Sequence, residues 1–332
     1  MAEADGTDRV LQRSRVPAAD GLVIETAGLT KRFGNHAAVD GIDLRVPEGS
    51  VFGFLGPNGS GKTTTIRMLL GLAYPSSGQV RLLGKEIPAL AGAVLPEVGA
   101  VVEGPAFYPW LSGRANLSLL DSVGPHPGGG ARGRADRVDG ALARVGLLAA
   151  ADKRYRRYSL GMRQRLAIAG ALVRRCRLLV LDEPTNGLDP QGMREVRGLI
   201  RGLATEGTSI FISSHLLSEV EQICTHAAVM RAGRIVAQGS LDELRAGHRA
   251  QLRVETPDVD LARRTLDGIA GVGVAVAAEG GDLQVELLDA LAEDVNAALV
   301  NAGVRVRGLQ RHATSLEDAF VALTGEGFDV DG

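Results

Sequence analysis

The sequence predicts an α/β fold with a second, smaller α+β domain at its C-terminal end. An apolar run over 51–55 is followed by a glycine-rich loop and then by a helical apolar pattern from Thr64 to Leu70, which gives the order strand, loop, helix. A second continuous apolar run, 178–181, is typical of a parallel strand that is covered on both faces. Beyond about residue 247, short segments with alternating apolar positions indicate the half-buried strands of the smaller domain.

Composition limits the class of protein. The 332 residues are 45% hydrophobic and 23% charged, which suits one large globular domain with a smaller companion. The formal net charge of -2 argues against a general nucleic-acid-binding protein, and no apolar run approaches the roughly 18 residues that span a bilayer. Residues 1–20 are polar and lack the apolar core of a secretory signal, so we predict a disordered leader. Cys176 and Cys224 have no metal-ligand spacing and are predicted to be free, reduced core residues of a cytosolic protein.

Antiparallel strands are predicted before the glycine-rich loop. Short apolar segments at 22–24 and 38–39, together with Ile42 and Leu44 alternating with charged residues, support this interpretation. Phe33 lies about two strands before the loop and could stack on a purine base if its ring is exposed. The residue type alone favours a core or turn position instead, and both interpretations stay open at this point.

The loop itself fits the pattern G-x-x-x-x-G-K-[ST] of phosphate-binding loops. Glycines allow a tight turn in which several backbone N–H groups point at one phosphate chain, and the following helix adds its positive end. Lys62 supplies a charge for the outer phosphates, and Thr63 supplies a hydroxyl for the magnesium ion that accompanies the nucleotide. We therefore predict nucleotide binding by Gly56, Pro57, Asn58, Gly59, Ser60, Gly61, Lys62, Thr63 and Thr64.

The region between the loop and residue 158 is less informative. An apolar run predicts a strand over 98–103 that ends at Glu103. The aromatic loop 104–110 holds the single Trp and is either a docking surface or a packed aromatic corner. Helices are predicted over 113–122 and 138–145. Between them, 124–134 is too rich in Gly and Pro for an ordered element, so we predict a mobile loop, with phosphate binding by its arginines as a weaker alternative.

Polar residues follow two further predicted strands. Asp182 and Glu183 come after the run 178–181, where adjacent carboxylates are costly unless a cation or hydrogen bonds compensate them. Given the phosphate loop upstream, we predict that they serve nucleotide-bound magnesium, with a pair of exposed loop acids as the alternative. His215 follows the predicted strand 209–213. Ligands of open α/β sheets collect beyond the carboxyl ends of strands, so His215 is a candidate site residue, with a structural role as the alternative.

Several other elements are predicted from local patterns. A helix is expected after Ser159, a good N-cap residue, and capping suffices to explain this serine locally. Helices are also expected near 196–203 and 220–224, with a hairpin around Gly233. In the smaller domain we predict strands at 252–254, 283–287 and 304–306, a fourth at 272–278, and helices near 291–299 and 316–323. A ferredoxin-like arrangement is one option for this domain.

Five motifs, taken in order, resemble those of ATP-binding-cassette (ABC) ATPases: 56–63, 158–162, 178–183, 187–189 and His215. Segments 103–110, 113–117 and 315–320 are similar to the ATP-binding subunits of bacitracin- and daunorubicin-resistance exporters. The resemblance implies a P-loop NTPase fold of the ABC type, with a mixed sheet core, an antiparallel β subdomain and a helical subdomain over about 104–172. It divides the chain into a leader (1–20), an ABC ATPase domain (21–246) and a C-terminal accessory domain (247–332).

The resemblance also implies roles for individual residues around one nucleotide. Phe33 would stack on adenine, while Lys62 and the loop amides would hold the phosphates. Thr63 and Asp182 would serve Mg2+, Asp182 through water. The two catalytic residues would be Glu183, which polarises the attacking water, and His215, which contacts the terminal phosphate.

In a dimer, Ser159 and Gly161 would complete the ATP site of the second subunit, and Asp189 would lie in the loop that crosses between subunits. The motif at 158–162 reads Tyr-Ser-Leu-Gly-Met, whereas the family usually has Leu-Ser-Gly-Gly-Gln. Glu103 replaces the family's strand-end glutamine, so its role near the nucleotide as metal ligand and membrane sensor is open, because a carboxylate there would be repelled by phosphates. The insert 124–134 has no role that the resemblance assigns.

The implied function is that of an ATPase subunit that uses ATP and Mg2+, pairs as a homodimer and powers a separate membrane-spanning permease subunit. Its substrate would be a drug, an antibiotic or a lipid-like molecule, and its place the cytoplasmic face of the plasma membrane. No nucleic-acid partner is expected. One alternative is a soluble ABC-type ATPase that acts on a non-membrane partner, which usually has two cassettes or a long coiled coil. The other is a nucleotide-dependent regulator, which would need a defective pair at 182–183.

Overall fold

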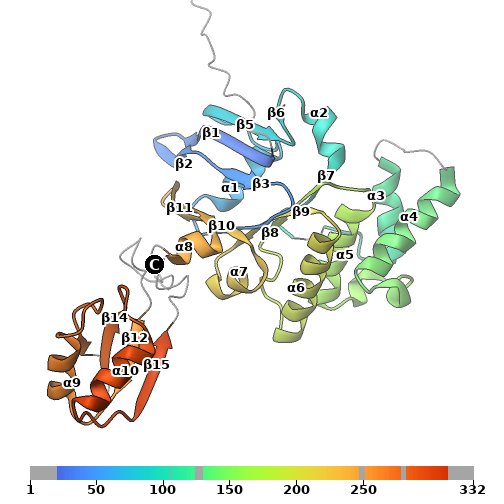
Figure 1. The fold of residues 1–332 in the computed structure, drawn as a ribbon. Coiled ribbons are helices and arrows are strands. Elements are labelled where there is room, and N and C mark those ends of the chain that lie inside the picture. The colour runs from blue at the N-terminus through green and yellow to red at the C-terminus, as the bar shows by residue number, and fades with distance from the viewer. Residues whose placement is uncertain (1–20, 105, 124–129, 247–250, 278–281, 313–332) are drawn as a thin grey trace, which may run out of the picture.

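The fold is described from a computed structural model over residues 21–104, 106–123, 130–246, 251–277 and 282–312 (Figure 1). The predicted leader, the link at 247–250 and the predicted helix at 316–323 lie outside these residues. In the described ranges, no helix combines the length and the apolar character that a membrane span requires.

A six-stranded mixed sheet forms the centre of the larger domain. Its order is β11 (Arg234–Ser240), β10 (His226–Arg231), β4 (Val51–Leu55), β9 (Ser209–Ser214), β8 (Leu178–Asp182) and β7 (Val98–Val101). Neighbours from β10 to β7 are parallel, and β11 pairs antiparallel with β10 in the predicted hairpin. The carboxyl ends of β4, β8 and β9 therefore meet at one edge of the sheet, as predicted.

Both faces of this sheet are buried, which explains the continuous apolar runs. Along β9, Ile210 and Ile212 face one hydrophobic core, whereas Phe211 faces the other, where it stacks on Phe52 with ring centroids 5.8 Å apart. The helices around the sheet are α1 (Lys62–Leu69), α6 (Pro190–Thr205), α7 (Leu217–Ile223) and α8 (Leu241–Ala246). The period of two along a strand thus divides the apolar residues between two cores.

The antiparallel subdomain includes the strands predicted before the phosphate loop and adds two strands that follow the loop. It contains β1 (Leu22–Phe33), β2 (His36–Ile42), β3 (Arg45–Pro47), β5 (Ser77–Leu82) and β6 (Lys85–Ile87). Pairing is antiparallel throughout, and β1 runs without interruption to Phe33, so it is longer than the apolar segment 22–24 indicated. Short helices α2 (Ala91–Val94) and η1 (Leu95–Glu97) connect this sheet to β7.

The helical part consists of α3 (Gly113–Val123), α4 (Gly130–Arg144) and α5 (Leu160–Leu172), with the short turns η2 (Leu148–Ala150) and η3 (Tyr155–Arg157). The prediction of a loop over 124–134 is wrong for its last residues, because α4 begins at Gly130. Asp121, almost fully buried on α3, explains this: its carboxylate accepts from Nη2 of Arg137 at 2.7 Å and lies 3.4 Å from Nε of Arg134. Hydrogen bonding to Arg137 lowers the pKa of Asp121, so a tertiary ion pair supports the start of α4 despite its composition.

The smaller domain has the order βαββαβ, which is the ferredoxin-like pattern. Its elements are β12 (Gln251–Glu255), α9 (Val259–Leu266), β13 (Val276–Ala277), β14 (Leu283–Glu286), α10 (Ala292–Asn301) and β15 (Gly308–His312). The sheet order is β13-β14-β12-β15. The strand predicted at 304–306 is wrong: Val304 is buried after α10, and the strand follows at β15. The helix α9 was not anticipated, although its apolar residues lie on one side of the helix.

Candidate functional site

The phosphate-binding loop connects β4 to α1, and two of its glycines are required by close packing. A Cβ on Gly56 would lie 2.4 Å from the carbonyl oxygen of Met230, and one on Gly61 would lie 2.3 Å from that of Ala38. Gly61 also has a φ of 107°, which side-chain-bearing residues rarely adopt. The helix that begins at Lys62 adds its N-terminal N–H groups and the positive end of its dipole to the loop.

Lys62 is buried against this loop. Its Nζ donates to the carbonyl oxygens of Gly56 (2.7 Å) and Pro57 (3.2 Å) and lies 3.4 Å from Oε1 of Glu183. Burial lowers the pKa of Lys62, and the negative charge of Glu183 offsets part of that effect. An ammonium group with so little water around it gains strongly from an added anion, which suits it to phosphate binding.

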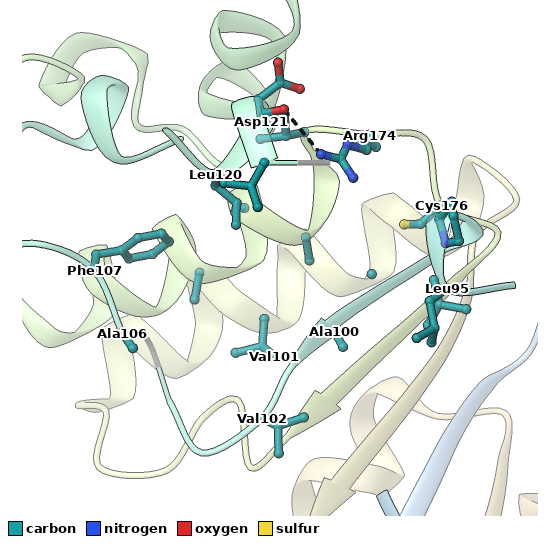
Figure 2. Close-up of a pocket in the computed structure, with 18 of the residues that line it drawn as sticks. Leu95, Ala100, Val101, Val102, Ala106, Phe107, Leu120, Asp121, Arg174 and Cys176 are labelled. Carbon is teal, nitrogen blue, oxygen red and sulfur yellow. Dashed lines mark hydrogen bonds between the residues drawn. The ribbon is translucent and has the colours of Figure 1, made fainter. Parts of the chain in front are cut away.

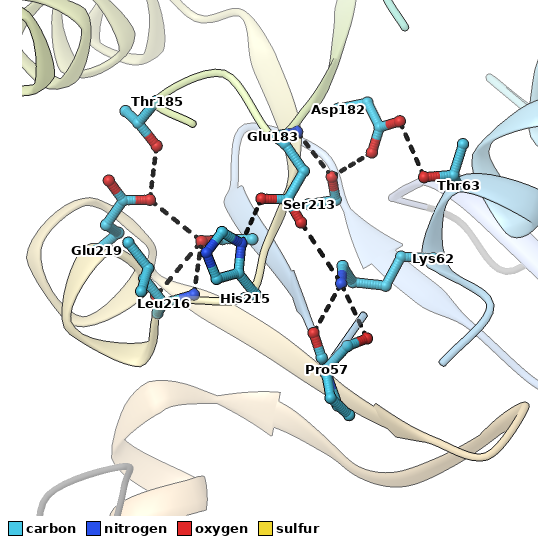
Figure 3. A network of polar contacts seen from close by, with 12 residues as sticks. Pro57, Lys62, Thr63, Asp182, Glu183, Thr185, Ser213, His215, Leu216 and Glu219 are labelled. Atoms are coloured by element: carbon cyan, nitrogen blue, oxygen red, sulfur yellow. Dashed lines mark hydrogen bonds and ion pairs between the residues drawn. The ribbon is translucent and has the colours of Figure 1, made fainter. Parts of the chain in front are cut away.

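The side chain of Glu183 lies between Lys62 of the phosphate-binding loop and His215, which follows β9 (Figure 3). Its Oε1 faces Lys62, and its Oε2 is 2.6 Å from Nδ1 of His215. Glu183 follows β8 and His215 follows β9, so two parallel neighbours deliver both side chains to one edge of the sheet. Glu183 also has a φ of 49°, a strained conformation that costs about 1–3 kcal/mol and is frequent at functional sites.

Asp182 is buried at the end of β8 and lies between two hydroxyl groups. Its Oδ2 accepts from Oγ1 of Thr63 at 3.1 Å, and its Oδ1 accepts from Oγ of Ser213 at 2.5 Å. The Ser213 hydroxyl oxygen also accepts from the backbone N–H of Glu183 at 2.9 Å. Mg2+ prefers oxygen ligands and is usually bound by one or two carboxylates together with substrate phosphates. Thr63 and Asp182 beside the loop therefore fit a magnesium ion that is bound to a nucleotide.

Proteins similar to this chain identify its family. Residues 39–186 match the family model described as ABC transporter. The chain is 38% identical to the bacitracin transport ATP-binding protein BcrA of Bacillus licheniformis over 307 residues, which are 92% of this chain and 98% of BcrA. The chain belongs to the ABC transporter family.

Other similarities agree with this family. The daunorubicin/doxorubicin resistance ATP-binding protein DrrA of Streptomyces peucetius is 35% identical, over 92% of this chain and 93% of DrrA. Among solved structures, cbiO1 of Clostridium perfringens, part of the ABC transporter complex cbiONQ, matches with a TM-score of 0.62 and 28% identity over 75% of this chain and 96% of cbiO1. As predicted, the chain is a nucleotide-binding ABC ATPase subunit that hydrolyses ATP to power transport.

Phe33 and Glu103 are two further residues that were predicted to contact the nucleotide. The ring of Phe33 is 57% exposed at the end of β1, with Nζ of Lys31 5.1 Å from its centroid, so a core position is wrong for this residue. Glu103 has a φ of 60° and forms an ion pair with Arg67 on α1, with more than half of its side chain exposed. Adenine stacking by Phe33 and a contact between Glu103 and the metal stay predictions.

The residues predicted to act across a dimer have local roles in this ABC subunit. The hydroxyl of Ser159 caps α5 by accepting from the backbone N–H of Met162 at 3.2 Å. The carboxylate of Asp189 caps α6 by accepting from the backbone N–H of Gly192 at 2.9 Å. Gly161 is different, because a Cβ there would meet only the Cα of Gly192, at 3.8 Å. Packing within this chain therefore leaves the glycine at 161 unexplained.

Sequence reasoning missed the hydroxyl residues that hold the acidic pair in place. Ser213 is the most important, because it bonds to both Asp182 and the backbone of Glu183. A signal was present: Ser213 is one of three buried serines in β9, and it is paired in register with Asp182. Finding it required knowledge that β8 and β9 are neighbours, which no local pattern gives.

Proposed function

We propose that two copies of this ABC ATPase close around ATP and drive a separate membrane-spanning exporter subunit from the cytoplasmic face of the plasma membrane. The contact from Lys62 through Glu183 to His215, beyond the phosphate loop, is the observation that carries the catalytic part. A drug, an antibiotic or a lipid-like molecule is the proposed substrate class. The support for it is that relatives across nearly the whole chain are named for bacitracin transport and for daunorubicin/doxorubicin resistance.

In the proposed mechanism, water attacks the terminal phosphate in line with the departing ADP. Lys62 and the loop N–H groups bind the phosphate oxygens, so negative charge that develops there is neutralised. Glu183 orients the attacking water and, as general base, takes up its proton as the oxygen–phosphorus bond forms and the bond to ADP breaks, while His215 holds the carboxylate and contacts the terminal phosphate. When bound by Thr63 and, through water, by Asp182, Mg2+ supplies further charge neutralisation on the phosphates.

The homodimer is supported by the first turn of α5. Glycine lowers the stability of a helix. At Gly161 a Cβ would have room within this chain and φ is not positive, so neither packing nor backbone conformation requires a glycine there. Close approach of a ligand from outside the chain is a sufficient reason. In the proposed closed dimer, the phosphates of the partner's ATP lie against Gly161 and Ser159 at the positive end of this helix, and Asp189 lies in the loop between subunits.

Substitution of Ser159 by Asp is expected to separate helix capping from phosphate contact. Aspartate caps a helix about as well as serine, so Ser159→Asp keeps the melting temperature within a few degrees of the wild-type value. Its charge would repel the partner's phosphates, so ATP-driven dimerisation and hydrolysis are expected to fall at least about tenfold. Size-exclusion chromatography with light scattering and a phosphate-release assay measure both. Normal dimers with ATP in Ser159→Asp would contradict the placement of the partner's nucleotide.

The membrane subunit is proposed to dock beside the aromatic loop after β7. A cavity of about 420 Å3 lies there, lined by residues from β7, that loop, α3 and α5 (Figure 2). Phe107 packs inward against Tyr155, with ring centroids 5.6 Å apart. Tyr108 and Trp110 contact each other and are 49% and 65% exposed. The loop thus combines a packed corner with an exposed aromatic pair, and such exposed pairs are typical of interfaces.

Loss of the exposed indole is expected to weaken membrane association but not nucleotide binding. In membranes of the native cells, Trp110→Ser is expected to reduce the membrane-bound fraction of the chain several-fold, because interface aromatics are often hot spots. Tyr74→Ser is a matched control, since Tyr74 is 70% exposed outside this region. Equal membrane binding by Trp110→Ser would contradict this docking site. Absence of the wild-type chain from the membrane fraction would favour the alternative of an ABC-type ATPase with a non-membrane partner.

A further inference from the structure

A buried carboxylate on α7 contacts the two segments that lead to the catalytic residues, namely the loop after β8 and the end of β9. Glu219 is only 5% exposed, and its Oε2 accepts from Oγ1 of Thr185 at 2.6 Å and from Oγ of Ser214 at 3.1 Å. Figure 3 shows this chain of contacts beside His215. The Ser214 hydroxyl oxygen also accepts from the backbone N–H of Leu216 at 3.0 Å, which closes the turn that follows β9.

The two partners of Glu219 lie next to the two catalytic residues, one in the loop after β8 and one at the end of β9. Thr185 lies two residues after Glu183, in the loop from β8 to α6, and Ser214 directly precedes His215. The distance of 2.6 Å between Oε2 of Glu183 and Nδ1 of His215 depends on the relative position of these two segments. We propose that Glu219 is a positioning residue that holds Glu183 and His215 at the spacing that hydrolysis requires.

The unequal use of the two carboxylate oxygens favours this role over simple core filling. Oε1 is buried and has no hydrogen-bond partner among the described residues, while Oε2 accepts both hydroxyl bonds. A buried carboxylate with an unpaired oxygen is costly, and an apolar side chain would fill the same volume at lower cost. The presence of a carboxylate is explained if a single oxygen must accept hydrogen bonds from both Thr185 and Ser214. The proposal rests on the ATPase activity and is independent of the exported substrate.

The test compares Glu219→Leu with Glu219→Gln in the full chain. Because small misplacements of catalytic groups cost up to about 100-fold in rate, Glu219→Leu is expected to lower kcat for ATP hydrolysis about 10- to 100-fold with KM changed less than about threefold. Glu219→Gln keeps a carbonyl oxygen that can accept both hydroxyl bonds, so it should restore kcat to within about threefold of the wild-type value. Glu221→Leu, on the outer side of the same helix, where Glu221 pairs with Arg245, is the matched control.

Smaller changes keep the test decisive if Glu219→Leu fails to fold. Thr185→Val and Ser214→Ala each remove one hydroxyl, and each is expected to lower kcat several-fold. When either change is combined with Glu219→Gln, kcat should fall by the same factor as in the single hydroxyl variant. The carbonyl oxygen of the glutamine can still accept from the remaining hydroxyl group. Wild-type kcat in both hydroxyl variants would overturn the proposal. Equal losses of kcat in Glu219→Leu and Glu219→Gln, tracking a common drop in melting temperature, would also overturn it by assigning Glu219 a structural role.

Discussion

Glu183→Gln is expected to bind ATP with near wild-type affinity and to hydrolyse it about 100- to 10,000-fold more slowly. That range is the usual contribution of a positioned general base. Glutamine preserves size and a hydrogen-bonding oxygen, and the backbone N–H of residue 183 can still donate to Oγ of Ser213. What is lost is the negative charge that lies 2.6 Å from His215 and 3.4 Å from Lys62, and with it the acceptor that polarises water.

Three measurements define this result. Rapid-mix phosphate release gives kcat, equilibrium binding of ATP gives Kd, and light scattering shows whether dimers accumulate with ATP, as expected when closure occurs without hydrolysis. Glu206→Gln is the matched control, because Glu206 pairs with Arg144 on the surface and is far more exposed. Hydrolysis by Glu183→Gln at the wild-type rate would remove Glu183 from the mechanism and leave only a structural reason for its strained backbone.

Much of this site follows from motifs whose chemistry is local. Three motifs come at the carboxyl ends of buried strands: the loop at 56–63, the acidic pair at 182–183 and the histidine at 215. Because ligands bind beyond the carboxyl ends of strands, the sequence predicts that these motifs converge. Their order along the chain also predicted the family. The N-cap at Ser159 was predicted for the same reason, since a cap is decided within one turn of helix, whereas the cap that Asp189 forms on α6 was not predicted.

Contacts between elements that are distant in the sequence could not be predicted from local patterns. Ser213 and Glu219 act through neighbours in space, whereas their local sequence shows only one of three serines in β9 and one of two acids on α7. The start of α4 was predicted wrongly for a related reason. Its glycine content favoured a loop, but the ion pair between Asp121 and Arg137 outweighs local helix propensity. In the smaller domain, Val304 and Val306 alternate as in a strand, yet they lie in the connection between α10 and β15.

Lys62→Met is expected to raise the Kd for ATP about 30-fold or more, which corresponds to about 2 kcal/mol, the lower end of the loss when one partner of a buried charge pair is removed. Methionine matches the length of lysine but cannot donate to the phosphates. The loss exceeds that of one hydrogen bond, because Glu183 and Asp182 would then face the phosphates without the neutralising ammonium. Lys85→Met, which removes an exposed ammonium 3.8 Å from Glu97, is the control, and its Kd should stay within about twofold.

The repulsive part of this effect can be measured separately. If uncompensated carboxylate charge contributes, the double variant Lys62→Met with Glu183→Gln should bind ATP more tightly than Lys62→Met alone, although it lacks two residues of the site. A double-mutant cycle with Glu183→Gln gives this coupling directly, since the two side chains are in contact. A fully additive cycle would show that Lys62 acts on the phosphates alone. A positive coupling would show that the same ammonium both attracts the nucleotide and makes a catalytic carboxylate tolerable beside it.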